Sequence, residues 1–185
     1  MRKLILAINT TLDGFCDHRA VIADGELHEF FNELLKKADT MLYGRKTFEL
    51  MEAYWPMIAR TKEGTKEEVE FAELLDPMEK IVFSKSGYKT DWKNTTVLQE
   101  MNPSVIKALK QKTGKNLLVG SPSILDQLIP MDLIDEFIYV VHPILAGAGK
   151  RFFEIEKLSQ KVQLSFQDCQ PFLSGAQALH YVRSK

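Results

Sequence analysis

The chain has 185 residues, of which 45% are hydrophobic, enough for the core of one α/β domain over residues 1–185. Its 24 Lys and Arg residues nearly balance 25 Asp and Glu residues, so the formal net charge of −1 gives no general attraction to nucleic acid or membrane. No run approaches the roughly 20 apolar residues that cross a bilayer, and the short N-terminal apolar run is no signal peptide, so we expect a cytoplasmic protein.

Strands and helices are predicted to alternate along most of the chain. Short apolar runs predict buried strands at 2–8, 40–44, 80–84, 116–120 and 134–143. Helical spacing and capping residues predict helices at 26–37, 45–54, 102–114 and 121–129, and a charged loop that enters a helix over 60–74. Alternating segments at 161–170 and 176–185 predict two antiparallel strands, joined by a turn near Ser174 and Gly175.

The order of these elements predicts the fold class. Strands separated by helices favour right-handed crossovers, and hence a mainly parallel sheet with helices on both faces. The C-terminal hairpin would add antiparallel edge strands. We therefore expect one three-layer α/β domain with a mixed, mainly parallel sheet.

Three predicted strands end in segments rich in glycine, hydroxyl groups and basic side chains. Since ligands bind at the carboxyl ends of strands in open α/β sheets, these segments form the candidate site. A helix begins at each of the first two segments, and the free N–H groups and the dipole of a helix start favour anions. The third segment surrounds a lysine with hydroxyl groups. Their residues are Gly44, Arg45 and Thr47, then Gly120, Ser121, Pro122 and Ser123, and finally Ser84 and Lys85.

This combination predicts NADPH rather than NADH as the cofactor. A pyrophosphate needs donors from two sides, and a 2′-phosphate needs one more basic, hydroxyl-rich patch. The segment 147–152, "GAGKRF", matches neither a Walker loop nor GxGxxG. The histidines lack metal-ligand spacing, so no metal site is expected, and Cys16 and Cys169 are expected to be reduced thiols.

Several motifs, taken in order, resemble one family. "TLDGF", "YGRKTFE", "FSKS", "LLVGSPSILDQLI" and "HPILAGAGKRFFE" resemble the dihydrofolate-reductase-like superfamily over nearly the whole chain. The resemblance is closest to stand-alone relatives of the C-terminal reductase domain of the riboflavin-biosynthesis deaminase-reductase. It implies a mixed sheet of about eight strands, NADPH binding, a homodimer, and reduction of a small heterocyclic, aminopyrimidine or pteridine-type substrate.

The resemblance also implies roles for individual residues. The three anion-binding segments would hold the cofactor phosphates, with Ser84 and Lys85 near the 2′-phosphate and 120–123 around the pyrophosphate. Ala7 and the stretch 9–15 would border the nicotinamide. Independently of the resemblance, the flexible Gly147 and Gly149 and the two phenylalanines of "HPILAGAGKRFF", which begins at residue 142, predict a strand-end loop near the substrate mouth or a dimer interface.

Two departures from the family concern the substrate. Riboflavin-pathway reductases carry a lysine where Ala7 stands and a glutamate where Val119 stands. Their "DDP" stretch after the second strand is also replaced, by "ELMEAYWP". These differences argue against the phosphoribosyl-aminopyrimidine substrate of that pathway.

Alternatives remain open for the chemistry. Asp13 either supplies a proton to the reduced substrate or has a structural role in an Asp-Gly turn. Glu26 or Glu29 could instead serve as the acidic residue that dihydrofolate reductase carries on its first helix. Tyr54 and Trp55 either line the binding site of a flat heterocycle or pack in the core. The alternative functions are dihydrofolate reductase proper and a nucleotide-binding module without catalysis.

Overall fold

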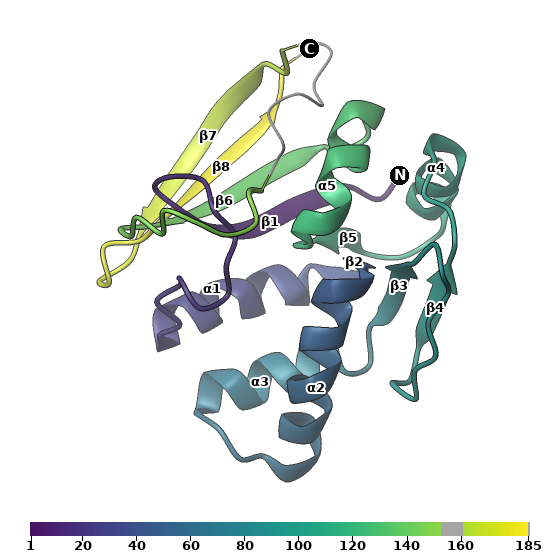
Figure 1. The fold of residues 1–185 in the computed structure, drawn as a ribbon, viewed down its shortest axis with the longest axis horizontal. Helices are drawn as coiled ribbons and strands as arrows, with labels where there is room; N and C mark the ends of the chain where they lie inside the picture. Colours follow the sequence, from purple (N-terminus) through teal and green to yellow (C-terminus); the bar gives the residue numbers. More distant parts are fainter. Residues whose placement is uncertain (153–160, 185) are drawn as a thin grey trace.

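A mixed β-sheet runs through the centre of the computed structural model, which describes residues 1–152 and 161–184 (Figure 1). Within these residues the sheet has eight strands in the order β4-β3-β2-β5-β1-β6-β8-β7. They are β1 (Leu4–Thr11), β2 (Ala38–Gly44), β3 (Glu79–Phe83), β4 (Thr95–Leu98), β5 (Asn116–Val119), β6 (Glu136–His142), β7 (Leu164–Pro171) and β8 (Gln177–Arg183). Strands β1 to β6 pair in parallel, whereas β8 pairs antiparallel with both β6 and β7, which confirms the predicted fold class.

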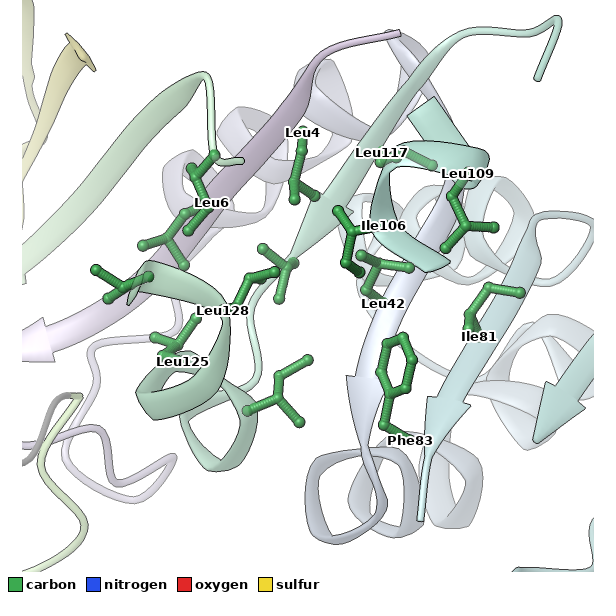
Figure 2. Close-up of a cluster of buried hydrophobic side chains, with 14 of the residues drawn as sticks. Leu4, Leu6, Leu42, Ile81, Phe83, Ile106, Leu109, Leu117, Leu125 and Leu128 are labelled. Carbon is green, nitrogen blue, oxygen red and sulfur yellow. The ribbon is translucent and has the colours of Figure 1, made fainter. Parts of the chain in front are cut away.

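Helices cover both faces of the sheet, as predicted. They are α1 (Gly25–Lys36), α2 (Arg45–Thr61), α3 (Lys66–Leu75), α4 (Pro103–Gln111) and α5 (Pro122–Leu128), and a short 3-10 turn, Ile129–Met131, follows α5. Side chains of α4 and α5 pack with β1, β2, β3 and β5 in one apolar cluster (Figure 2). Side chains of α1, α2 and α3 pack on the opposite face in a second cluster. No helix within the described residues is long and apolar enough to cross a bilayer.

Helix starts follow local sequence signals. The Asp24 side chain accepts a hydrogen bond from the Leu27 N–H at 2.9 Å and caps α1. Thr65 and Glu68 form a reciprocal capping box at the start of α3. Asn102 caps α4 directly before Pro103, as the sequence predicts. These caps fix where each helix leaves its loop, and α1 and α3 pack against each other beside the site described below.

Two elements differ from the prediction. Strand β4 was not expected, because its residues, Thr95–Leu98, form a four-residue edge strand that is at most half-buried and gives no strong apolar signal. Helix α2 extends to Thr61 and passes through Pro56, whereas the sequence pattern ends it at residue 54. The C-terminal turn lies where predicted, since the Gly175 N–H donates to the Phe172 carbonyl oxygen at 2.9 Å. Cys16 and Cys169 are free thiols, as expected.

The parallel pairing brings functional segments together. Strands β3, β2, β5 and β1 are neighbours and run the same way, so their carboxyl ends meet at one edge of the sheet. Helix α2 begins directly after β2, and two residues separate the end of β5 from the start of α5. This edge of the sheet carries the candidate site.

Candidate active site

Three adjoining cavities form a cleft along this edge. The first, here the basic chamber, has a volume of about 810 Å³ and is lined by the ends of β2 and β3 and the starts of α2, α4 and α5. The second, the middle chamber, measures about 590 Å³ and shares Lys46 and Ser123 with the first. The third, the inner chamber, measures about 530 Å³ and shares Asn9, Thr47 and Gly120 with the second. The cleft is therefore continuous from one end to the other.

The basic chamber gathers positive charge and hydroxyl groups. Arg45 and Lys85 both line it, as do Ser86, the second hydroxyl of the predicted "FSKS" segment, and Lys46, for which the sequence predicted no role. The Arg45 guanidinium lies within 3.4 Å of the Ser86 hydroxyl and 3.3 Å of a Glu49 carboxylate oxygen. These side chains are more than a third exposed, so they can turn towards an incoming anion.

Ser84 has a structural rather than a ligand-facing hydroxyl. It also lines the basic chamber, but it is 7% exposed and its hydroxyl donates to the Gly87 carbonyl oxygen at 2.8 Å. Its backbone N–H continues the pairing of β3 with β4 by donating to the Leu98 carbonyl oxygen. Ser84 therefore shapes the turn that presents Lys85 and Ser86.

The middle chamber lies where two helices begin. Thr47, Gly120, Pro122 and Ser123 line it, and neither α2 nor α5 receives a side-chain cap. The N–H groups of the first turn of α2 are therefore available to an anion. A Cβ on Gly44 would collide with the Ser123 side chain, so glycine at this position lets the two helix starts approach each other.

Ser121 joins the two helix starts instead of facing a ligand. Its side chain is fully buried and lines none of the three chambers. Its hydroxyl accepts a hydrogen bond from the Gly44 N–H at 2.9 Å and donates one to the Thr47 hydroxyl at 2.8 Å. The structure thus gives this predicted cofactor contact a supporting role, at the junction of β2, α2 and β5.

The inner chamber is mostly apolar and lies between the sheet and helices α1, α2 and α3. Ala7 lies on its sheet side, and Tyr54 and Trp55 line its helical wall, as the ring-binding interpretation requires. Trp55 is held by Phe71, whose ring centroid lies 4.4 Å away, and by the edge of Tyr54 at 5.0 Å. The chamber can therefore hold a flat ring against aromatic surfaces.

The two glutamates considered as acids do not reach this chamber. Glu26 accepts a hydrogen bond from the Leu173 N–H at 2.6 Å, and neither Glu26 nor Glu29 lines the cleft. Helix α1 instead presents Leu27, His28 and Phe31 to the chamber. Sequence spacing alone did not distinguish which of these neighbouring positions faces the sheet.

The structure favours the structural alternative for Asp13. Its carboxylate accepts hydrogen bonds from the Thr11 hydroxyl at 2.5 Å and from the backbone N–H groups of Ala146 and Gly147, at 3.1 and 2.7 Å. These hydrogen bonds lower the pKa of Asp13 to about 2, and the bond from Thr11 makes the largest contribution. The carboxyl group is therefore ionised at neutral pH. It also lines none of the three chambers. Asp13 therefore holds the loop after β6 through these hydrogen bonds.

An Asp13→Asn substitution is expected to lower stability at neutral pH and to cost less in acid. The folded-state pKa lies below the ordinary value of 3.8, so the ionised carboxylate stabilises the fold above about pH 4, and this contribution is lost as the pH falls towards about 2. Chemical denaturation of both proteins at about pH 7 and about pH 3 measures the difference. Asp91→Asn, at an exposed position, is the control. A stability difference that stays constant with pH would contradict the assignment.

The loop after β6 lies at the mouth of the cleft, as expected. The Cys16 N–H donates to the Lys150 carbonyl oxygen at 2.7 Å, and Phe15 pairs with Arg151 in an isolated bridge. Lys150 also lines the middle chamber. Residues 153–160, which include the last residue of the "HPILAGAGKRFF" motif, lie outside the described residues.

A buried histidine orients an amide in the cleft. His142 is fully buried, and its Nδ1 accepts a hydrogen bond from the Ile22 N–H at 3.3 Å. Its Nε2–H therefore donates to the Asn9 Oδ1 at 3.0 Å, which leaves the Asn9 NH₂ group to act as a donor in the chambers that Asn9 lines. Burial lowers the pKa of His142 and favours this neutral form. Sequence reasoning missed the pair, because the two residues lie 133 positions apart.

Known structures share this architecture. A putative riboflavin biosynthesis protein from Shewanella sp. PV-4 superposes with a TM-score of 0.72 at 17% identity, over the full length of both chains. The dihydrofolate reductase of Enterococcus faecalis, complexed with NADP(H), gives a TM-score of 0.67 at 18% identity over 99% of this chain and 97% of its own. The deaminase/reductase of Thermotoga maritima gives 0.68 at 18% identity, over 99% of this chain and 57% of its own. At these identities the similarity establishes the fold.

Sequence relatives lead to the family. Two Bacillus subtilis (strain 168) proteins described as uncharacterised match nearly end to end. YyaP is 32% identical over 97% of this chain and 94% of its own length, and YwjB is 25% identical over 99% of each. A model of the RibD C-terminal domain matches residues 2–178. The motif resemblance is thereby confirmed, and the chain belongs to the RibD C-terminal domain family.

Proposed function

We propose that the protein is an NADPH-dependent reductase of a small, flat heterocycle of the aminopyrimidine or pteridine type. One observation carries the proposal: the cleft offers a basic end, two uncapped helix starts in the middle and an aromatic end, in that order. A phosphorylated adenosine, a pyrophosphate and a nicotinamide follow one another in NADPH in the same order. The family and its reductase folds support the oxidoreductase class.

The donor set fits the cofactor. Arg45, Lys85 and Ser86 supply two cations and a hydroxyl where a 2′-phosphate would bind, and they would gain little from the hydroxyl of NADH. The N–H groups at the start of α2 would hold the pyrophosphate. Bound NADPH would supply the hydride. The residues of the chain would bind the cofactor, orient its nicotinamide against the substrate and exclude water.

The inner chamber favours a substrate ring without fixed charge. Ala7 and Val119 both line it, at the positions where riboflavin-pathway reductases carry charged residues. Ala7 is 8% exposed and Val119 is 1% exposed, so neither position brings a charge to the sheet side of the chamber. An apolar ring face would lie there without leaving a charge unpaired.

Removing both cations from the basic chamber is expected to change cofactor preference. The Arg45→Ala, Lys85→Ala double variant should bind NADPH roughly 10- to 100-fold more weakly, because charge-assisted hydrogen bonds to the 2′-phosphate are lost. NADH affinity should stay the same. Fluorescence titration with both nucleotides measures the two dissociation constants.

The matched control is Lys89→Ala, which removes an exposed lysine four positions from Lys85 and outside the basic chamber. It should leave both affinities unchanged. Unaltered NADPH affinity in the double variant would exclude the phosphate assignment. NADH bound as tightly as NADPH by the wild type would favour an NAD-dependent enzyme instead.

Substrate reduction is tested separately from cofactor binding. NADPH oxidation, followed by absorbance, would be measured against dihydrofolate, smaller dihydropterins and a set of aminopyrimidines. We expect oxidation with an unphosphorylated ring. Tight NADPH binding with no oxidation across the set would support a nucleotide-binding module without catalysis. The homodimer and the cytoplasmic location are further proposals, to be checked by light scattering of the purified protein and by cell fractionation.

A further inference from the structure

His28 is a fixed titratable group in the inner chamber. It lies in the first turns of α1 and lines the chamber beside Trp55 and Phe71. Both aromatic rings meet the imidazole edge-on, with centroids 6.3 and 6.4 Å away. Its Nδ1 lies 2.9 Å from the Asp24 carbonyl oxygen. The ring is thus held by one hydrogen bond and two aromatic contacts.

The Asp24 contact decides which nitrogen exchanges a proton. A carbonyl oxygen can only accept a hydrogen bond, so Nδ1 carries a hydrogen in both the neutral and the charged imidazole. Protonation therefore changes at Nε2. Within the described residues, Nε2 has no hydrogen-bond partner, so it is available to a ligand in the chamber.

Other acids in the described cleft are less suited to the reaction. Burial raises the pKa of the Cys16 thiol to about 12, and burial also raises the pKa of both Tyr43 and Tyr54, so these groups hold their protons at neutral pH. Asp13 lies outside the chambers and is ionised. His18 lines the same chamber, but its side chain is 66% exposed on the loop after β1. His28 is the group that the fold holds in place.

We propose that His28 is the proton donor for a substrate ring that carries a C=N bond. This rests on the proposed function, since the reductant is NADPH. The hydride from C4 of the dihydronicotinamide forms a C–H bond at the ring carbon, and the C=N electron pair moves to the nitrogen. That nitrogen takes the proton from Nε2 of the His28 imidazolium. The products are NADP⁺, the reduced ring and a neutral imidazole, which regains a proton from water.

A carboxylate on the facing helix α3 interacts with His28. Glu68 on α3 is electrostatically coupled to His28, and its carboxylate also accepts a hydrogen bond from the Tyr54 hydroxyl of α2 at 3.3 Å. The hydrogen bond from the Thr65 N–H makes the largest contribution to lowering the pKa of Glu68, and Tyr54 and His28 lower it further. The Glu68 carboxylate therefore stays ionised. The Asp24 carbonyl oxygen faces the other nitrogen, and His18 is a second titratable group that lines the same chamber.

The test uses the whole protein saturated with NADPH and the probe 6-methyl-7,8-dihydropterin, which contains a ring C=N bond and no phosphate. Stopped-flow absorbance measures hydride transfer between about pH 5 and about pH 9. In the wild type the rate should fall as the pH rises, because a general acid loses its proton. His28→Gln should lower the rate about 100-fold and remove this pH dependence. NADPH affinity should not change.

Three further variants locate the effect. His28→Glu replaces one acid by another, and the neighbouring Glu68 carboxylate would raise its pKa, so it should restore part of the rate. Glu29→Gln, an exposed change one position along α1, should behave like the wild type. His18→Gln tests the other histidine of the chamber and should keep the pH dependence.

The outcomes are distinct. Equal rates and pH profiles in the wild type and His28→Gln would overturn the proposal. So would loss of the pH dependence in His18→Gln alone, or a wild type that binds NADPH but transfers no hydride to the dihydropterin. Absence of NADPH binding would instead overturn the proposed function.

Discussion

A Gly120→Ala protein is expected to bind NADPH at least about 100-fold more weakly than the wild type. A Cβ at this position would lie 2.7 Å from the Ala7 carbonyl oxygen, which belongs to the backbone of the neighbouring strand β1. Backbone cannot swing aside as a side chain can, so the ends of β5 and β1 would have to separate. Gly120 lines both the middle and the inner chamber, so this movement would deform the cleft where pyrophosphate and nicotinamide are proposed to bind.

The same substitution is expected to lower the free energy of unfolding by about 1–3 kcal/mol, the usual cost of overpacking. Gly25→Ala is the matched control, because a Cβ there would meet only the Glu67 side chain at 3.8 Å, an ordinary contact. Fluorescence titration and chemical denaturation of both variants separate lost binding from lost stability. A Gly120→Ala protein that binds NADPH normally would show that the cofactor does not bind over the ends of β5 and β1.

Sequence reasoning located the cleft because its signals are local. A glycine at a strand end, followed by a helix start, is visible in "YGRKT" and "VGSPS", and parallel pairing then forces both to one edge. The direction of each side chain is not local. Ser121 and Ser123 lie two positions apart, yet one is buried between two helix starts and the other faces the cleft. Only the packing of α5 against β2 distinguishes them.

The roles of residues that act through distant partners could not be settled from the sequence for the same reason. From the sequence, Asp13 is either a turn carboxylate or a catalytic acid. Only the structure shows that two N–H groups of the loop after β6 donate to its carboxylate. His142 and Asn9 come together only because β6 pairs with β1 in register. His28 was passed over beside Glu26 and Glu29, since the face of α1 that meets the sheet is set by tertiary contacts. Strand β4 lacked an apolar pattern because an edge strand buries little.

Lys80 is a further position whose role no sequence pattern indicates, and its loss is expected to destabilise the protein most. Its side chain is fully buried in β3, where the ammonium group donates to the carbonyl oxygens of Asp76, Met78 and Lys93 at 2.8, 2.9 and 3.3 Å. It also lies 4.5 Å from the centre of the Trp92 ring. Lys80→Ala would leave three carbonyl groups without this donor and a void beneath Trp92, so we expect a loss of about 3–5 kcal/mol.

Two comparisons separate these contributions. Lys80→Met keeps most of the packed volume and should therefore be less destabilising than Lys80→Ala, while Lys93→Ala, an exposed side chain, should have little effect. Burial lowers the pKa of Lys80 to about 8, below its ordinary 10.5. The folded state therefore releases this proton at lower pH than the unfolded state, and between about pH 8 and about pH 10.5 the wild type should gain stability relative to Lys80→Met.

A substitution of Lys80 should also alter the cleft, because aromatic contacts link this side chain to the start of α2. Trp92 packs on Phe48 at 5.5 Å, and Phe48 lies in the first turn of α2, directly after Thr47. If this chain of contacts holds the start of α2, Lys80→Met should weaken NADPH binding under conditions in which circular dichroism shows a folded protein. Unchanged binding in that variant would mean that the start of α2 does not depend on this chain of contacts, and it would point to other supports such as the Ser121 hydrogen bonds with Gly44 and Thr47. A Ser121→Ala protein distinguishes the two supports, because it removes those bonds and leaves the aromatic contacts in place.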